Sequence, residues 1–130
     1  MLVILIGNAQ SDLTKTIIGC ASAYIRHLVN GFPGIIYQRS LAIEFEKNNI
    51  VFEQEIHLPV YYLDSEIGAR RVDFLVEKQV VVELKVLVEI TPPHYAQIID
   101  YLKAYRLEVG LLLNFGEASL KYKRFLRSSS

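Results

Sequence analysis

The chain has 130 residues, of which 52% are apolar and 22% are charged, and fourteen Lys and Arg balance fourteen Asp and Glu. This length and composition predict one globular domain spanning residues 1–130 and exclude a disordered chain. The zero net charge neither requires nor excludes nucleic acid as a partner, because binding depends on a local basic patch.

Cysteine usage and hydropathy exclude further classes. Cys20 is the single cysteine, so the chain has no disulfide framework and no cysteine-based zinc site. The apolar opening, Met1–Ile6, lacks a basic leader region and is far shorter than a membrane span, and no other stretch is long enough. We expect a cytoplasmic protein with no membrane partner.

Hydrophobic periodicity and turn residues predict alternating helices and strands. The expected elements are helices over 13–29 and 35–48, strands over 52–62, 70–77 and 79–87, a turn over 64–68, a helix over 91–106, a strand over 109–115 and a final edge strand over 120–126. Thr91 and the prolines after it are expected to start the third helix. The order predicts an α/β fold in which helices flank a mixed central β-sheet.

Three charged residues interrupt the apolar strands over 70–77 and 79–87, namely Asp73, Glu83 and Lys85. Ionised groups among Val, Phe and Leu are costly to bury and need partners. Glu83 and Lys85 are two residues apart, so both side chains point to one face of their strand. If Asp73 lies on the neighbouring strand of a hairpin, two carboxylates and one ammonium group converge, which suits a divalent metal ion and an activated water.

Each charged residue also has a purely structural interpretation. Asp73 can pair with Arg70 or Arg71, and Glu83 and Lys85 can line the solvent face of an edge strand. The apolar residues around Glu83 argue for a central strand instead, in which an exposed face is not expected.

The helix after the hairpin carries His94, Gln97 and Tyr101 at i, i+3, i+7 spacing, which places them in one stripe. A Gln and a Tyr beside a core face can orient a metal-bound water or a phosphate oxygen. The alternative is an ordinary boundary between core and surface, with His94 on the surface.

Together these residues resemble the PD-(D/E)XK nuclease superfamily, whose RecB-like members share the pattern of Asp73, Glu83-Leu84-Lys85 and Gln97-x-x-x-Tyr101. The chain resembles the small bacterial GxxExxY proteins more closely. The segments that carry this resemblance are 17–19, 37–44, 71–73, 91–94 and 110–116. It covers about residues 13–125 and leaves residues 1–12 as an N-terminal extension.

The resemblance implies a restriction-endonuclease-like core that hydrolyses DNA phosphodiester bonds with Mg²⁺ or Mn²⁺. Asp73 and Glu83 would be metal ligands, with the carbonyl of Leu84 as a third. Lys85 would position the attacking water or stabilise charge in the transition state. Gln97 and Tyr101 would support the site or orient the substrate.

One position departs from the family pattern, because Gly34 stands where the GxxExxY motif has its glutamate. In the superfamily an acidic residue on this early helix completes the metal site. Two functions therefore stay open, a nuclease with a weakened site and a degenerate domain that binds nucleic acid or protein without cutting. A third hypothesis is a homodimer subunit, with Met1–Ile6 and the tyrosines as contact surface.

Overall fold

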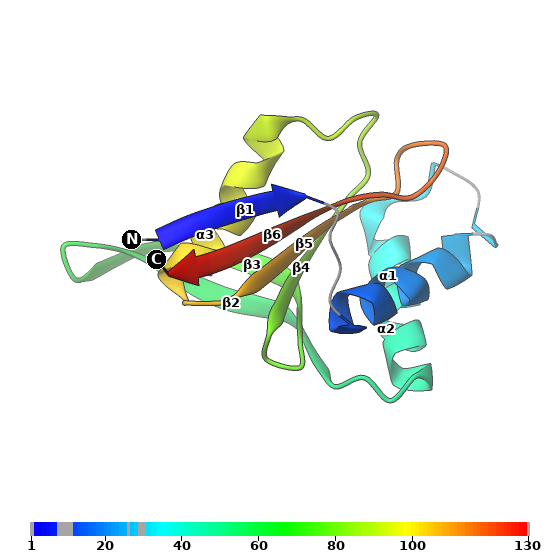
Figure 1. Ribbon diagram of the computed structural model, residues 1–130, viewed down its shortest axis with the longest axis horizontal. Coiled ribbons are helices and arrows are strands. Elements are labelled where there is room, and N and C mark those ends of the chain that lie inside the picture. Colours follow the sequence, from blue (N-terminus) through cyan, green and yellow to red (C-terminus); the bar gives the residue numbers. More distant parts are fainter. Residues whose placement is uncertain (1, 8–11, 26, 29–30, 130) are drawn as a thin grey trace.

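The computed structural model describes residues 2–7, 12–25, 27–28 and 31–129, which form a six-stranded sheet with helices on both faces (Figure 1). The strand order is β1-β6-β5-β4-β3-β2. The elements are β1 Leu2–Gly7, α1 Asp12–Ile25, α2 Gly34–Lys47, β2 Phe52–Tyr62, β3 Ser65–Val76, β4 Val80–Lys85, η1 Pro92–Tyr95, α3 Ala96–Ala104, β5 Val109–Asn114 and β6 Lys121–Ser129.

The sheet is mixed, as predicted. Neighbouring strands are antiparallel except β4 and β5, which are parallel. Parallel neighbours need a crossover connection, and the segment that carries η1 and α3 supplies it. The β2–β3 hairpin projects beyond the body of the sheet (Figure 1). The α/β fold with flanking helices is confirmed, and it is that of a restriction-endonuclease-like core.

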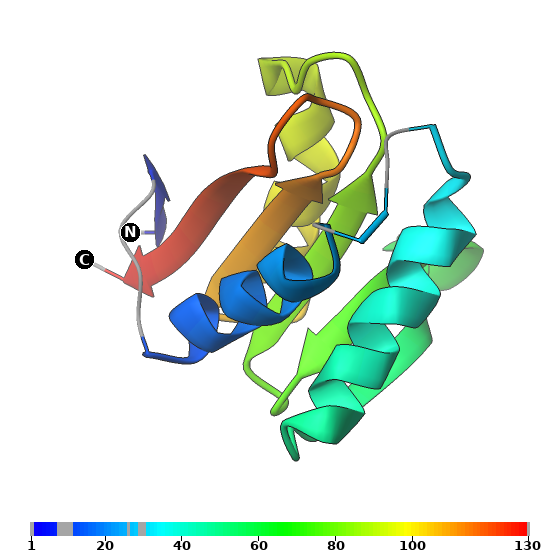
Figure 2. The same ribbon diagram turned by 90° about the vertical axis from the view of Figure 1, so that its right-hand side faces the viewer.

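Each face of the sheet buries its own apolar cluster. Helices α1 and α2 lie together over one face (Figure 2), where they cover Phe74 and Val82. Helix α3 covers the other face, over Val81 and Leu112. Strand β4 contributes to both clusters, which explains its continuous apolar run, because a central strand has no solvent face.

The β2–β3 hairpin changes face in its middle. Phe52 packs on the α1–α2 cluster and Ile56 on the α3 cluster, although alternate residues of a regular strand share one face. Between them, Glu55 has a φ of 55°. The ladder between β2 and β3 skips Glu55 and the opposite residue, Asp73. One distortion of this hairpin therefore lies at Asp73, and a second, a register shift, lies between Val60 and Tyr61.

Several element boundaries differ from the predictions. Helix α1 ends at Ile25, where the amides of His27 and Leu28 both donate to the Tyr24 carbonyl in a closing turn. Residue 29, to which the helix was predicted to extend, lies outside the described residues, as does Met1. The predicted turn over 64–68 is tighter, because Leu63 and Asp64 have φ values of 48° and 65° and form a two-residue hairpin turn.

The predicted helix over 91–106 begins as the 3₁₀ turn η1 and continues as α3. The prolines at 92 and 93 supply the fixed φ of a helix start without an N–H to satisfy. The Thr91 amide donates to His94 Nδ1 at 3.1 Å, which closes the cap. Thr91 is therefore the cap as predicted, and His94 serves that cap.

Strand β1 was not predicted. Six apolar residues in a row do not distinguish a strand from a buried helical segment. β1 pairs with β6 over the whole of Leu2–Gly7, so the prediction that the last strand lies at the sheet edge is wrong. In the described part of the chain, no helix is long and apolar enough to cross a membrane.

Candidate active site

Asp73 and Glu83 meet between β3 and β4, where the ladder of backbone hydrogen bonds stops after the Phe74–Val82 pair. Beyond that pair, the Leu84 amide donates to Asp73 Oδ2 at 2.7 Å. In return, the Asp73 amide donates to Glu83 Oε1 at 3.1 Å. Each carboxylate is thus held by the backbone of the opposite strand, so the two acids are adjacent.

Lys85 lies on the same face of β4 as Glu83, by the alternation of a regular strand. This is the face that α3 covers, because Val81 belongs to the α3 cluster. Lys85 is half-buried, whereas Glu83 is only 4% exposed. The charge of Lys85 favours the ionised form of both acids. The structure therefore brings Asp73, Glu83 and Lys85 together on one side of the sheet.

The two acids carry more negative charge than the surrounding protein neutralises. Burial, reinforced by the charge of Asp73, raises the pKa of Glu83 to about 8, against the opposing effects of the Asp73 amide and Lys85. Burial also raises the pKa of Asp73, although the Leu84 amide and Lys85 lower it. Burial and the neighbouring carboxylate therefore favour the protonated form of Glu83 when no cation is bound. A cation between the acids would relieve this penalty.

The backbone at Leu84 adds another oxygen. In a strand, the N–H and C=O of one residue point to the same side. The Leu84 amide points to Asp73, so its carbonyl also faces that strand. The next carbonyl, of Lys85, faces the other way and accepts the Phe115 amide at 2.9 Å. Two carboxylates and one carbonyl are hard oxygen donors that suit Mg²⁺ or Mn²⁺.

Within the described ranges, no third acidic, His or Cys side chain joins the two acids in a ligand set. No group of three or more His, Cys, Asp or Glu among the described residues is arranged to hold a metal ion. Mg²⁺ commonly uses one or two carboxylates and keeps several waters, so the donors present still fit it.

Gln97 and Tyr101 connect α3 to β3. Gln97 Nε2 donates to the Tyr101 hydroxyl at 2.8 Å, and that hydroxyl donates to the Arg71 carbonyl at 3.1 Å. Tyr101 is buried and Gln97 is half-buried. Because Arg71 lies two residues before Asp73, the pair fixes the strand that carries the first carboxylate. Both residues thus lie beside the acids, where they support the backbone of β3.

Arg71, one of the two arginines that the structural interpretation offered as an ion-pair partner for Asp73, pairs with another acid. Its guanidinium lies 3.9 Å from the carboxylate of Glu55, and both side chains are largely exposed. A pair this exposed contributes little to stability.

Gly34 is the first residue of α2, on the opposite face of the sheet from Lys85. A Cβ at this position would lie 4.0 Å from Val86 Cγ2 and within 4 Å of nothing else. Val86 follows Lys85 directly, so position 34 abuts the end of β4. The backbone leaves room there for a larger side chain.

Asn114 is a positioning residue that sequence reasoning did not single out. It is fully buried at the end of β5, opposite Lys85. Its Oδ1 accepts the amides of Leu87 and Gly116 at 2.9 and 3.1 Å. Its Nδ2 donates to the Leu87 carbonyl at 2.9 Å and to Glu117 Oε2 at 2.8 Å. All four hydrogen-bonding positions of the amide are filled, which fixes the segment after Lys85.

Gly116 completes this contact. A Cβ at Gly116 would lie only 2.3 Å from the Leu87 carbonyl oxygen and 2.4 Å from its nitrogen. Only glycine allows this close approach of two backbones. The segment 114–116, part of the block that resembles the GxxExxY proteins, therefore has a physical role beside the candidate site.

Asn114→Ala is expected to lower the free energy of unfolding by about 2–4 kcal/mol, because it leaves the partly buried amide and carbonyl of Leu87 without hydrogen-bond partners. Urea unfolding followed by circular dichroism measures the change. Asn114→Asp is the matched control, since it keeps the acceptor but sets a carboxylate against Glu117 and the Leu87 carbonyl. A loss below about 0.5 kcal/mol for alanine would show that these bonds do not hold the segment.

Comparison with known proteins identifies the family of the chain. A family model described as the PD-(D/E)XK nuclease superfamily matches residues 11–125. No curated protein and no solved structure matches the chain. The matched range runs from just before α1 into β6 and contains both acids, Lys85 and the Gln97–Tyr101 pair. The chain belongs to the PD-(D/E)XK nuclease superfamily.

Proposed function

We propose that the protein is a metal-dependent nuclease of the RecB-like branch and the GxxExxY group, which hydrolyses DNA phosphodiester bonds. The observation that supports this proposal best is the reciprocal pair of bonds between Asp73 and Glu83, with Lys85 on the same face. A purely structural pair of buried acids would gain nothing from an arrangement that raises the pKa of both.

In this proposal Asp73, Glu83 and the Leu84 carbonyl hold Mg²⁺ or Mn²⁺. When bound, the ion would polarise the scissile phosphate and lower the pKa of a water. Lys85 orients that water or neutralises the charge that develops on the phosphate oxygens. Gln97 and Tyr101 keep β3 in place through the Arg71 carbonyl, and Asn114 keeps the segment after Lys85 in place.

Two measurements on the unmodified protein test the proposal. Isothermal titration calorimetry with Mn²⁺ should detect one ion bound per chain at up to millimolar concentration. A panel of single-stranded, duplex and flapped DNA, incubated with Mn²⁺, should be cleaved and should be protected by EDTA. A protein that binds no Mn²⁺ at millimolar concentration would contradict the nuclease function.

Gly34 favours a second candidate, a degenerate domain that binds nucleic acid without cutting it. The missing carboxylate leaves two acids where the superfamily has three, and the described residues supply no replacement. In that case the protein would bind DNA whether or not metal is present. The same titration and cleavage assays separate the two functions.

Gly34→Glu is expected to bind Mn²⁺ about tenfold more tightly and to cleave DNA faster, because the GxxExxY pattern that the chain resembles has its acidic metal-site residue at this position. Gly34→Gln is the matched control, since it has the same size and the same effect on helix flexibility but no charge. If both variants bind Mn²⁺ equally, the missing carboxylate is not what limits the site.

A further inference from the structure

A cavity of about 600 Å³ lies between the β2–β3 hairpin and α3. Its volume is within the roughly 300–1,000 Å³ of small-ligand sites. One wall comes from Leu58, Pro59 and Tyr61 of the hairpin, and the other from Tyr101 and Tyr105 at the end of α3. The Tyr105 hydroxyl donates to the Pro59 carbonyl and so joins the two walls.

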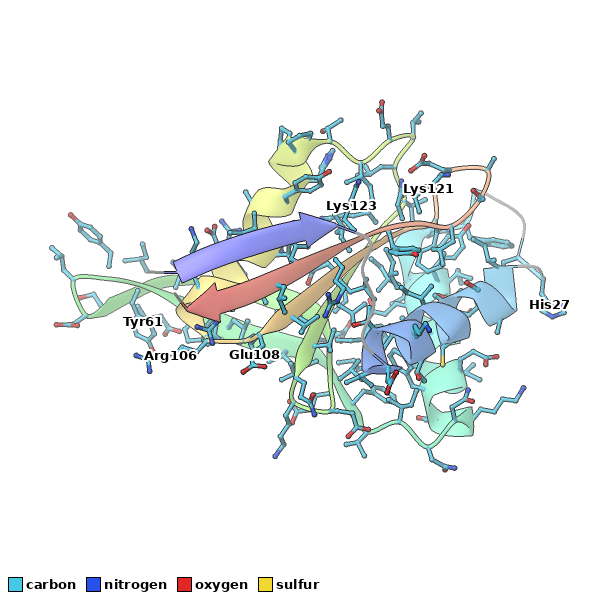
Figure 3. The ribbon with its side chains drawn as sticks, viewed as in Figure 1. His27, Tyr61, Arg106, Glu108, Lys121 and Lys123 are labelled. Atoms are coloured by element: carbon cyan, nitrogen blue, oxygen red, sulfur yellow. The ribbon has the colours of Figure 1, made fainter. Side chains whose placement is uncertain are left out.

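Aromatic rings make up part of both walls. Tyr61 is 63% exposed on the projecting hairpin, although it is a large ring that folding would ordinarily bury. It lies at the end of the molecule that also carries Arg106, opposite the end that carries His27 (Figure 3). Tyr105 is half-buried beside it, so Tyr61 is the exposed ring of the lining on which a nucleic-acid base can stack.

The cavity also carries positive charge on both walls. Arg70 lines it from β3 and Lys103 from α3, and both side chains are exposed. Asp100 is the acidic residue of the lining, so the two cations outnumber it. Aromatic faces combined with basic side chains are the recognition elements of single-stranded nucleic acid, which needs stacking for bases and cations for phosphates.

Tyr101 links the cavity to β3, the strand that carries Asp73. Tyr101 lines the cavity, and its hydroxyl bonds to the Arg71 carbonyl, two residues before Asp73. Arg70 lies close enough to that hydroxyl to favour its ionised form, against the burial that raises the pKa of Tyr101. The cavity therefore lies on the α3 side of the sheet, the side that also carries Glu83 and Lys85, so one nucleic-acid strand can run along that side from the acids to the cavity.

We propose that the cavity receives an unpaired nucleotide of the substrate strand. Its base would lie against Tyr61 and Tyr105, and its phosphate between Arg70 and Lys103. A base can enter such a hollow only when it has left the duplex. The inference rests on the proposed nuclease function and adds a substrate class, DNA that is single-stranded beside the scissile bond.

The test is binding of a fluorescein-labelled 20-nucleotide single strand and of the matching duplex, measured by anisotropy in EDTA so that nothing is cleaved. The wild type should prefer the single strand. Arg70→Ala/Lys103→Ala should weaken single-strand binding by at least tenfold and reduce the slope of log affinity against log salt by about 0.7, the value for one neutralised phosphate of a single strand. Tyr61→Ala should cost about tenfold, as expected when one stacking contact is lost.

The matched control is Lys47→Ala/Lys78→Ala, which removes the same charge from two exposed residues outside the cavity lining. It should change single-strand affinity by less than about twofold, as for a loss of net charge alone. The replaced side chains are all largely exposed, so each variant should keep the thermal unfolding midpoint of the wild type.

Three results would overturn the inference. The cavity and control variants could lose affinity equally, which would mean that only net charge matters. The wild type could bind the duplex as well as the single strand. Tyr61→Ala could instead convert a dimer to a monomer in light scattering without affecting DNA binding, which would assign the hairpin to a second copy of the chain.

Failure of this inference differs from failure of the nuclease function. If the wild type cleaves DNA through Asp73 while the cavity variants bind and cleave normally, only the nucleotide site is wrong. If the cavity variants lose single-strand binding but the wild type never cleaves, the nucleotide site stands and the catalytic function is wrong.

Discussion

Asp73→Asn is expected to abolish Mn²⁺ binding and to lower any DNA cleavage by about a thousandfold or more. The substitution removes one of the two carboxylates, and a neutral amide is a much poorer ligand for a hard cation. Because the charge of Asp73 helps to raise the pKa of Glu83, its removal should also lower that pKa. Calorimetry with Mn²⁺ measures the loss of metal binding, and cleavage assays under single-turnover conditions measure the loss of activity.

The asparagine leaves the fold intact, which makes the result interpretable. Its Oδ1 can still accept the Leu84 amide that Asp73 accepts at 2.7 Å. Asp64→Asn is the matched control, since it makes the same substitution in the exposed hairpin turn, where asparagine tolerates a positive φ. Cleavage that survives in both Asp73→Asn and Lys85→Ala would exclude this site as the source of activity.

The sequence predicted which candidate-site residues lie side by side, because these contacts form within one element or between neighbouring elements. Glu83 and Lys85 share a face by strand alternation, and a short turn makes the strand that carries Asp73 the neighbour of β4. The spacing of Gln97 and Tyr101 places them on one stripe of α3, and they do bond to each other. Contacts of this kind depend on one or two elements, whose periodicity the sequence displays.

What was missed depends on contacts between distant segments. Strand β1 forms because it pairs with β6, more than a hundred residues later in the chain. The sequence of an apolar segment does not show which strand it pairs with. The positive φ of Glu55 follows from packing on both faces of the hairpin, since glutamate does not favour it. In the sequence Asn114 looks like the polar end of a strand, but its amide has four partners, two on Leu87 and one each on Gly116 and Glu117.

Gly34 shows where sequence resemblance and structure supply different information. The resemblance identifies the position as the place of a missing acid. The structure adds that a Cβ there would meet only Val86 Cγ2, at 4.0 Å, so the backbone leaves space for a side chain to begin. The resemblance thus implies one ligand fewer at position 34, and the structure shows a backbone there with space for a Cβ.

Glu83→Gln is expected to stabilise the metal-free protein at alkaline pH while abolishing metal binding. The folded-state pKa of Glu83 is about 8, raised from 4.5 by burial and by the charge of Asp73. Between those two values the folded protein binds more protons than the unfolded chain, so its stability falls as pH rises through that window. Glutamine has no proton to lose, and its Oε1 can still accept the Asp73 amide.

The difference in unfolding free energy between Glu83→Gln and wild type should therefore increase by at least about 2 kcal/mol from pH 5 to pH 8. Urea unfolding in EDTA at each pH measures it, with Glu53→Gln, on the exposed part of β2, as the control that should show no such trend. If the stability of wild type and of Glu83→Gln changed in parallel with pH, folding would not raise the pKa of Glu83.

Saturating Mn²⁺ should recover the lost stability of the wild type at pH 8 and should leave the Glu83→Gln variant unchanged, because only an ionised pair gains from the cation. Two adjacent buried carboxylates lower the stability of the metal-free fold and are stabilised when a cation binds between them, which is the behaviour expected of metal ligands.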